Sequence, residues 1–306
     1  MVLEYQKTLN KSHTISGKGL HTGKFVTITL NPAPLNSGVA FCRTDIPGRP
    51  IIKAIATNVT QTERGTVLLS NGASVSTVEH LLSALYSMGV DNALIEADGP
   101  EIPILDGSAK FYADIIDKDG LCVQHDARDV FEVKEAIICK DPLSGSEIAI
   151  YPDNKFSVTI MVDFDSEVIG QQYALFDFDT NYLQEIAPCR TFVFLHDILP
   201  LIDKGLIKGG DLENAIVIAE KSVSIIDKEK LQKLVKKRDD VPIEKGYINT
   251  KLLYTNECAR HKLLDLLGDL SLSGFYFKGR VIALKPGHKI NTDISKILIE
   301  KWQQRV

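Results

Sequence analysis

The chain contains 306 residues, of which 44% are hydrophobic and 25% are charged, and it carries a formal net charge of −5. This length accommodates two domains, and the acidic balance argues against nucleic acid or an anionic membrane surface as a partner. The five cysteines are scattered without a Cys-x-x-Cys pair and no stretch reaches about 18 uninterrupted apolar residues, so we expect a cytoplasmic protein without a disulfide framework, a thiolate zinc site or stable membrane insertion.

The first third of the chain has the pattern of short strands separated by turns. Strands are expected at 24–30, 66–69 and 92–96, and helices at 77–88 and 109–118. Gly89 and Gly120 follow the two helical segments, as glycine commonly does where a helix ends. Strands and helices are therefore mixed within this part of the chain.

The polar segment 124–129 is the best candidate for a linker, and it divides the chain into domains at 1–127 and 128–306. After it the same order of elements restarts, with strands near 130–139, 147–152 and 157–164 and helices at 256–272 and from about 292 to 304. Each half places several strands before a long helix that carries a histidine. The sequence therefore predicts an α+β protein of two similarly built domains that face each other.

Two of the predicted helices, about 180 positions apart, carry residue types that bind metals. His261 and Asp265 are four residues apart, so on a helix they project from one face and can share an ion. His80 can supply a third ligand, and Glu79 beside it is the type of base that a metal-activated water needs. Two imidazoles, one carboxylate and an open fourth position describe a catalytic zinc site. The ordinary alternative for His261 and Asp265 is an ion pair on a solvated helix face.

Glu79 and His80 also have an ordinary structural interpretation. Ser76-x-x-Glu79 matches a capping box, in which Glu79 would bond back to the main chain of Ser76. His80 would then be a partly buried polar residue. Against this, the His80 side of the helix carries small residues such as Ser83 and Ala84, which leave room for another group to approach.

Two loops carry further histidines. Segment 18–24 superficially suggests a phosphate-binding loop, but its glycine spacing fails and Phe25 stands where a Ser or Thr would bind magnesium. We therefore expect a β-turn there and only a weak site candidate in His21. A lone loop histidine such as His288 is more often unrelated to catalysis, and physical reasoning alone assigns no role to segment 188–194.

Taken together, these segments resemble the family of zinc-dependent UDP-3-O-acyl-N-acetylglucosamine deacetylases, which act in lipid A biosynthesis. Six stretches match in the family's order and cover nearly the whole chain. They are Gly19–Gly23, Ser76–Leu81, Pro100–Ser108, Arg190–Phe192, Arg260–Asp265 with Gly268–Leu270, and Gly287–His288. Six ordered matches are far more specific than any single motif.

The resemblance implies a role for each candidate site residue. It makes His80, His261 and Asp265 the zinc ligands, Glu79 the general base and His288 the cationic acid of the site. It also implies further residues that contact the substrate or position other groups. Lys262 and Phe192 would contact the substrate, and Thr191 would hydrogen-bond the developing oxyanion. Asp269 would orient His288, and His21 is implied only weakly.

The resemblance also implies a fold. Each of the two α+β domains would layer helices on a sheet, and the domains would join with their helices inward and the zinc at their interface. Each domain would carry a small insert, and the second insert would fall within about 193–220. There Ile216–Ala219 could line a channel for a fatty acyl chain, although an ordinary core strand explains this segment equally well.

The implied reaction is hydrolysis of the N-acetyl group of UDP-3-O-(3-hydroxyacyl)-N-acetylglucosamine, with release of acetate, by a zinc-dependent amidohydrolase. The expected cofactor is Zn²⁺, with Fe²⁺ as an alternative, since a His₂Asp ligand set accepts both. The expected partner is the acylated UDP-sugar, while protein partners stay open. Some family members are fused to a downstream acyl-carrier-protein dehydratase, and the resemblance leaves open whether one normally follows here.

Three other functions are compatible with parts of the pattern. A metallopeptidase would also use zinc and a glutamate, but the His-Glu-x-x-His helix is missing. A non-catalytic zinc-binding or sugar-nucleotide-binding module would not need both Glu79 and His288. A scaffold with surface ion pairs would bind no stoichiometric metal.

Overall fold

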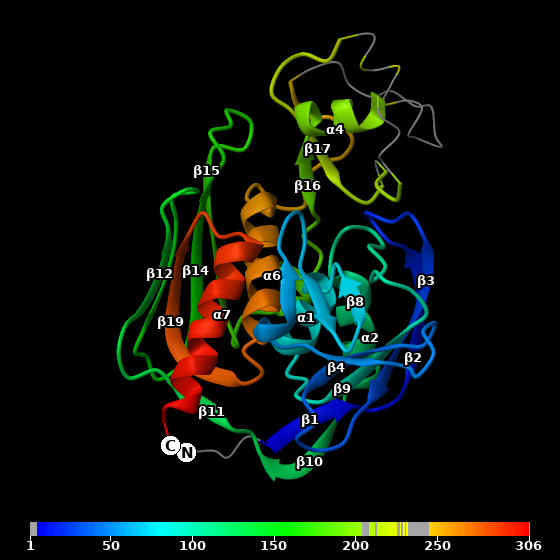
Figure 1. Ribbon diagram of the computed structural model, residues 1–306. Coiled ribbons are helices and arrows are strands. Elements are labelled where there is room, and N and C mark those ends of the chain that lie inside the picture. Colours follow the sequence, from blue (N-terminus) through cyan, green and yellow to red (C-terminus); the bar gives the residue numbers. More distant parts are fainter. Residues whose placement is uncertain are drawn as a thin grey trace.

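The structure is a computed structural model that describes residues 5–203, 208–211, 213–224, 227, 229, 231 and 245–305. Two sheets enclose a layer of helices (Figure 1). The first sheet has the strand order β2 (His13–Lys18), β3 (Phe25–Pro32), β9 (Ala93–Ala97), β4 (Val39–Arg43) and β5 (Ile51–Lys53). The second has the order β12 (Ile137–Asp141), β13 (Ser146–Tyr151), β19 (Tyr276–Leu284), β14 (Phe156–Asp163) and β15 (Gln171–Asp177), and β11 (Val130–Glu132) also pairs with β19.

The two sheets share one topology. In each, two hairpins flank a central strand that comes later in the chain: β9 runs antiparallel to β3 and parallel to β4, and β19 runs antiparallel to β13 and parallel to β14. One helix precedes each central strand and one follows it. These helices are α1 (Glu79–Ser87) and α2 (Lys110–Asp119) in the first half and α6 (Glu257–Ser271) and α7 (His288–Gln303) in the second. The prediction of an α+β fold with two similarly built units is confirmed.

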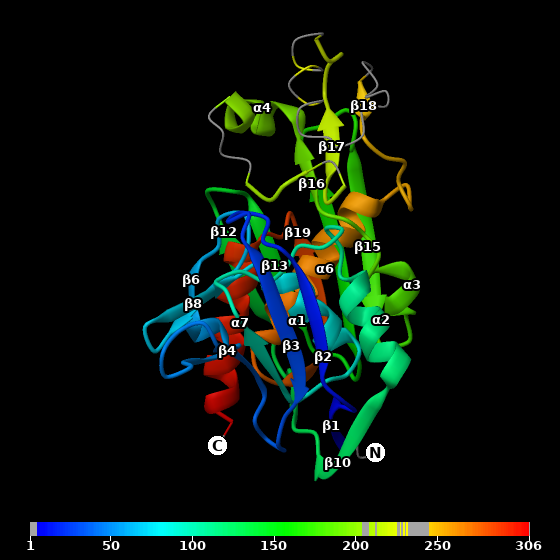
Figure 2. The same ribbon diagram turned by 90° about the vertical axis from the view of Figure 1, so that its right-hand side faces the viewer.

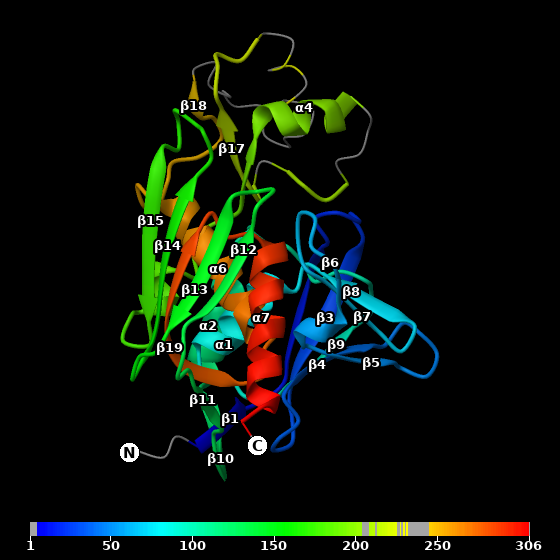
Figure 3. The ribbon, with the colours of Figure 1, turned by 60° about the vertical axis from the view of Figure 1, so that its left-hand side comes forward.

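The helices lie between the sheets, and one hydrophobic core joins both halves. The strands bury alternate residues, such as Ile28 and Leu30 in β3 and Val158 and Ile160 in β14, which are all at most 1% exposed. Helices α1, α6 and α7 fill the space between the two sheets in two views (Figures 1 and 3). Burying each large aliphatic side chain contributes about 1.5–3 kcal/mol, so this shared core holds the halves together.

The crossing of α1 and α6 is unusually close at Gly268. A Cβ atom added to Gly268 would lie 2.1 Å from the carbonyl oxygen of Glu79, which is far inside contact distance. Only a glycine lets the two helix backbones approach to this degree. The main chain of Glu79 on α1 therefore rests directly on α6.

A smaller unit stands at one end of the molecule, beyond the helix layer (Figures 1 and 2). It contains β16 (Phe192–Phe194), α4 (Leu195–Asp203), β17 (Ile216–Ala219) and β18 (Gly246–Tyr247), and its three strands pair in the order β16-β17-β18. The expected insert at about 193–220 falls in this unit. Residues 204–207 and 212 of that range lie outside the described residues.

The remaining elements are short. In the first half they are β1 (Tyr5–Leu9), the 3-10 turn η1 (Ala56–Asn58), a three-stranded sheet of β6 (Val59–Gln61), β7 (Val67–Ser70) and β8 (Ala73–Ser76), and β10 (Leu121–Ala127); in the second half there is α3 (Tyr182–Glu185). No helix among the described residues is long and apolar enough to cross a membrane.

Two details of the sequence-based prediction are wrong. The expected linker 124–129 is largely strand, because Leu121–Ala127 forms β10 and pairs with β1. Its polar character reflects the exposure of this two-stranded ribbon, not an absence of structure. The last helix was expected from about Thr292 but begins at His288, because the loop residue Gly287 is followed at once by helical backbone.

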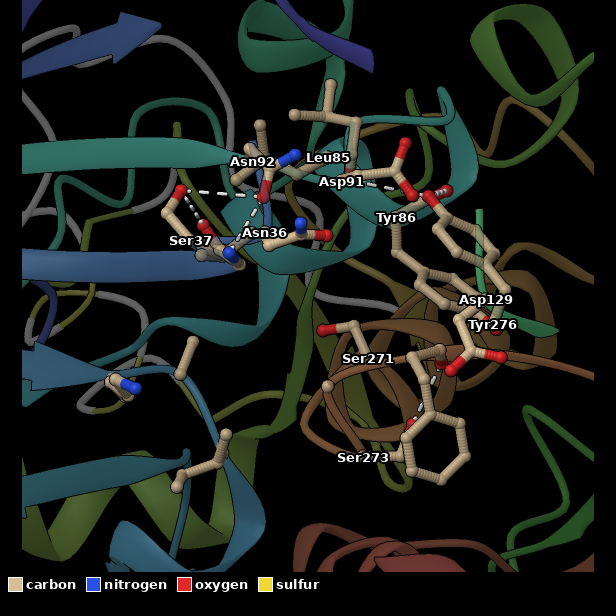
Figure 4. Close-up of a pocket in the computed structure, with 18 of the residues that line it drawn as sticks. Asn36, Ser37, Leu85, Tyr86, Asp91, Asn92, Asp129, Ser271, Ser273 and Tyr276 are labelled. Atoms are coloured by element: carbon tan, nitrogen blue, oxygen red, sulfur yellow. Dashed lines mark hydrogen bonds between the residues drawn. The ribbon is translucent and has the colours of Figure 1, made fainter. Parts of the chain in front are cut away.

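A cavity of about 470 Å³ lies between the halves near the C-terminal ends of α1, α6 and α7 (Figure 4). Asn92 occupies one side of it, where its side chain donates to Gln6 and Gln124 and accepts from the main-chain nitrogen of Gly38. Asp91 pairs with Arg128 at 2.7 Å. The Asn92 bonds all lie within the first half, while the Asp91–Arg128 pair links that half to the first residue of the second.

Candidate active site

His80, His261 and Asp265 meet between the halves. His80 comes from the first turn of α1, while the other two lie one turn apart on α6. One candidate ligand atom from each residue lies within 4.8 Å of the others, and all three side chains are buried. The Nε2 atoms of the two histidines are 3.1 Å apart, and Asp265 Oδ1 is 3.6 Å from His80 Nε2.

The chemistry of these three residues fits a bound metal ion. Nδ1 of His80, Nδ1 of His261 and Oδ1 of Asp265 are buried and make no hydrogen bond within the part of the chain that the structure describes. Buried polar atoms are normally hydrogen-bonded, and exceptions need a reason. Burial lowers the pKa of His261 to about 3 although Asp265 opposes the change, so the ring is neutral and keeps the lone pair that a metal needs. The alternative of an ion pair on a solvated helix face is wrong, because His261 and Asp265 are each only 2% exposed.

Glu79 points into the same site. Its Oε2 accepts a hydrogen bond from the main-chain nitrogen of Thr66 at 3.1 Å. The capping-box alternative is wrong, because the main-chain nitrogen of Ser76 instead donates to the carbonyl oxygen of Pro100 and α1 has no side-chain cap. Burial raises the pKa of Glu79, while the nearby His288 and His80 act against this rise. A carboxylate with a raised pKa is a better proton acceptor.

His288 faces this cluster from the first residue of α7. Its Nδ1 donates to Oδ2 of Asp269 at 2.8 Å, and its Nε2 lies 4.0 Å from Oδ2 of Asp265. Burial alone would lower the pKa of His288, but Asp269, with Asp265 and Glu79, outweighs burial and raises the pKa to about 9. The imidazole is therefore protonated at neutral pH and can donate a proton.

Asp269 lies behind His288 and is completely buried. Its carboxylate accepts three side-chain hydrogen bonds, from Thr66 Oγ1 at 2.7 Å, from His288 at 2.8 Å and from Asn291 Nδ2 at 2.9 Å. Sequence reasoning missed Thr66 and Asn291, because neither stands in a pattern that marks it.

The site opens into a cavity of about 690 Å³. All the candidate residues except Asp269 line it: His21, Glu79, His80, Thr191, Phe192, His261, Lys262, Asp265 and His288. Lys262 donates from Nζ to Oδ2 of Asp265 at 2.7 Å and lies 5.8 Å from the centre of the Phe192 ring. Val217 of β17, in the segment for which the resemblance allowed a lining role, also lines the cavity.

Thr191 is held in place by a buried ion pair next to it. Arg190 bonds through Nε to Oε1 of Glu257 at 2.9 Å and through Nη2 to Oε2 at 3.1 Å. Glu257 is completely buried at the start of α6 and also accepts the main-chain nitrogen of Leu253. A bidentate arginine–carboxylate pair fixes direction as well as distance. Segment 188–194, to which physical reasoning alone assigned no role, thus attaches the cavity wall to the helix that carries His261 and Asp265.

Glu101 organises the loop that carries His21. It is completely buried, and its carboxylate accepts from the main-chain nitrogens of His21 and Thr22 and from the hydroxyls of Thr22 and Thr77. The loop joins the paired strands β2 and β3, as expected of a turn between strands, and it is closed by a bond from the main-chain nitrogen of Gly23 to the carbonyl oxygen of Gly19. The exposed ring of His21 reaches the carbonyl oxygen of Arg64 at 3.2 Å.

The fold and the site define an α+β protein of two matched halves with a candidate metal centre, a buried carboxylate and a protonated histidine between them. A sequence model of the LpxC family, UDP-3-O-acyl N-acetylglycosamine deacetylase, matches residues 6–234 and 239–300. The chain belongs to this family.

Three relatives illustrate the similarity. The bifunctional enzyme LpxC/FabZ of Bacteroides thetaiotaomicron is 49% identical over 95% of this chain and 63% of that protein. The UDP-3-O-acyl-N-acetylglucosamine deacetylase of Syntrophotalea carbinolica is 39% identical over 98% of this chain and 90% of that protein. The one of Chlamydia caviae is 34% identical over 99% of this chain and 100% of that protein. This chain spans 63% to 66% of the length of three bifunctional relatives, the one above and those of Porphyromonas gingivalis and Chlorobaculum tepidum.

Proposed function

We propose that this chain hydrolyses the N-acetyl group of UDP-3-O-(3-hydroxyacyl)-N-acetylglucosamine in lipid A biosynthesis, which releases acetate and a free amine. The observation that carries the proposal is that one cavity gathers His80, His261 and Asp265 with Glu79 and His288. The family and the names of its deacetylase relatives supply the substrate.

The metal ligands would be His80, His261 and Asp265, and we propose Zn²⁺ as the ion, with Fe²⁺ as the alternative. A bound ion of this kind polarises a carbonyl oxygen and lowers the pKa of water. Two neutral imidazoles and one carboxylate are a ligand set of catalytic zinc sites. Lys262 keeps its hydrogen bond to Asp265, which would orient that carboxylate toward the ion.

The chain's own residues would move two protons. Glu79 would accept a proton from the attacking water, because its buried carboxylate has a raised pKa. His288 would donate the proton of its Nε2 to the departing amine, since Nδ1 is engaged by Asp269. The C–N bond then breaks, so the nitrogen leaves as a neutral amine and the acyl group leaves with the water oxygen as acetic acid, which ionises to acetate in water.

The cavity wall would hold the substrate. The Thr191 hydroxyl would donate to the developing oxyanion, a preorganised contact of the kind that often dominates catalysis. Phe192 would pack against the substrate, and the Lys262 ammonium would meet its anionic part. His21 would contribute only weakly from its exposed loop.

The acyl chain would extend toward the smaller unit of β16, α4 and β17. Val193, Ile198 and Val217 of this unit line the cavity with apolar surface. Such a wall favours an aliphatic chain because it removes methylene groups from water.

Two further expectations stay predictions: the division of the chain into domains at 1–127 and 128–306, and a cytoplasmic setting for the reaction.

The deciding experiment measures acetate release from the acylated UDP-sugar by the wild type and by Glu79→Ala, with the bound metal quantified in both. We expect both proteins to bind one equivalent of metal, and Glu79→Ala to be slower by a factor on the order of 10²–10⁴. Metal without release by the wild type would indicate a binding module. A wild type that binds no stoichiometric metal would exclude the proposed site.

A further inference from the structure

Thr66 contacts the proposed base Glu79 and also Asp269, the carboxylate that holds the proposed acid His288. It precedes β7 directly and is completely buried. Its main-chain nitrogen donates to Oε2 of Glu79 at 3.1 Å, and its hydroxyl donates to Oδ1 of Asp269 at 2.7 Å. Asp269 in turn accepts Nδ1 of His288 at 2.8 Å. One residue of the first half thus reaches the base directly and the acid through a single carboxylate.

The direction of the Thr66 hydroxyl bond follows from the available protons. A threonine hydroxyl has one proton, and the ionised Asp269 carboxylate can only accept. The hydroxyl oxygen also lies 3.4 Å from Nδ1 of His288, but that nitrogen already gives its proton to Asp269 over the shorter distance of 2.8 Å. The Thr66 hydroxyl therefore donates its hydrogen bond to Oδ1 of Asp269.

This bond fixes the rotation of the Asp269 carboxylate. Oδ1 is held by Thr66, while Oδ2 receives both His288 and Asn291. With Oδ1 free, the carboxylate could turn about its own axis and carry the His288 ring with it. With Oδ1 tied, the ring has one orientation, and its Nε2 faces the cavity.

The main chain of Thr66 is itself held in place. Its carbonyl oxygen accepts the main-chain nitrogen of Thr77, two residues before Glu79, at 3.1 Å. The preceding Gly65 has a φ of +154°, and a Cβ there would lie 3.0 Å from Oε1 of Glu79. The main chain of Thr66 therefore positions two groups at once: the Glu79 carboxylate, which it bonds directly, and its own side chain, which bonds Asp269.

We propose that Thr66 is a positioning residue that sets the His288 imidazole relative to Glu79 through its hydroxyl bond to Asp269. The inference rests on the proposed function, because it assigns His288 and Glu79 as acid and base. Thr66 does not line the cavity, so its hydroxyl acts on the rate of proton transfer and not on substrate binding.

The test compares Thr66→Val, which removes the hydroxyl but keeps the shape, with Thr66→Ser, which keeps the hydroxyl. We expect Thr66→Val to lower kcat by about 10- to 100-fold with KM unchanged, the usual range for residues that orient groups around a metal. Thr66→Ser should stay within about twofold of the wild type, because its donor remains. A wild-type kcat in Thr66→Val, or a rise in KM alone, would overturn the proposal.

Thr292→Val is the matched control. Thr292 is also a buried threonine, 2% exposed on α7, but its hydroxyl makes no hydrogen bond within the described chain. The same substitution there removes no bond, so kcat should stay within about twofold of the wild type. A loss equal to that of Thr66→Val would attribute the effect to the core and overturn the proposal.

A second readout is independent of turnover. The Nδ1 proton of His288 is followed by NMR in protein with ¹⁵N-labelled histidine, and its resonance is assigned by its loss in His288→Gln. We expect a changed resonance in Thr66→Val and a wild-type resonance in Thr66→Ser; identical spectra in all three proteins would overturn the proposal.

If the wild type releases no acetate, the proposed function fails while this comparison still decides the role of Thr66. If Thr66→Val does not fold, Thr66→Ser decides. Because the serine keeps the hydroxyl, a kcat about tenfold below that of the wild type would contradict a role for the hydroxyl.

Discussion

Gly268 of α6 lies against the main chain of Glu79 of α1 with no room for a side chain between them. A Cβ at Gly268 would come within 2.1 Å of the Glu79 carbonyl oxygen. The next residue along α1 is the candidate ligand His80, and the candidate ligand Asp265 lies three residues before Gly268 on α6. The helix contact and the spacing of the candidate ligands are therefore one structural feature.

Gly268→Ala is expected to push α1 away from α6. Overpacking at a rigid contact typically costs about 1–3 kcal/mol of unfolding free energy, and here it would also separate His80 from Asp265. Denaturant unfolding and metal quantification should both show a loss. Gly287→Ala is the control for stability, since a Cβ there meets no atom within 4 Å. Equal stability and equal metal content in Gly268→Ala and the wild type would contradict the close contact.

Removal of the metal is expected to abolish acetate release, and added Zn²⁺ or Fe²⁺ should restore it. His261→Ala should bind metal much more weakly, because it lacks one of three ligands. His13→Gln is the matched control: His13 forms an ion pair with Asp119 outside the cavity and should leave the metal content unchanged. Stoichiometric metal in His261→Ala would show that the ion binds elsewhere.

The pKa of His288 predicts how stability depends on pH. In the metal-free protein this pKa is raised from 6.5 to about 9, so the folded state binds a proton that the unfolded state loses. The stabilising effect is fully present below about pH 6.5 and disappears as the pH rises through 9. Unfolding free energies of the metal-free wild type and of His288→Gln, measured from pH 6 to 10, should therefore differ at low pH and converge at high pH. Parallel curves would contradict the prediction.

His261 should produce the opposite dependence. Burial lowers its pKa from 6.5 to about 3, so the folded state excludes a proton that the unfolded state binds. The metal-free protein should lose stability as the pH falls from about 6.5 toward 3. This loss should shrink in His261→Phe, which cannot be protonated at this position. Unchanged acid sensitivity in that variant would assign the effect to other groups.

Breaking the Arg190–Glu257 pair should affect both stability and catalysis. Glu257→Ala leaves the Arg190 guanidinium without its carboxylate in a partly buried place, and loss of one partner from a buried pair costs about 3–5 kcal/mol. The neighbouring Thr191 would lose its fixed position, so kcat should also fall. Arg280→Met is the control, because its ion pair with Asp153 is largely exposed and worth at most about 1 kcal/mol. Similar unfolding free energies for both variants would refute a special role of the buried pair.

Much of the fold could be predicted from the periodicity of apolar residues and from the glycines and polar turns that separate the elements. The helices α1, α2 and α6 stand close to their expected ranges because glycines and polar turns mark their ends. The start of α7 was missed because Gly287 and His288 were interpreted as part of one loop. Segment 124–127 was missed for a different reason: an exposed ribbon of two strands carries polar residues on both faces and looks like a linker.

The candidate site was only partly visible in the sequence. His261 and Asp265 share a helix face, so their spacing alone suggested a shared ion. Thr66 and Glu101 could not be found this way, since each acts through contacts with residues distant in the chain. His288 was discounted as a loop histidine on spacing alone, and the family resemblance then paired it with Asp269. The structure adds that Asp269 is completely buried and accepts the Nδ1 proton of His288.

The order of the site residues along the chain has a consequence for biosynthesis. Glu79 and His80 are made early, His261 and Asp265 follow some 180 residues later, and His288 comes last on α7. A growing chain therefore carries the proposed base long before it carries either the remaining ligands or the acid. Since the proposed acid lies on α7, we expect no acetate release until that helix has left the ribosome and packed between the sheets.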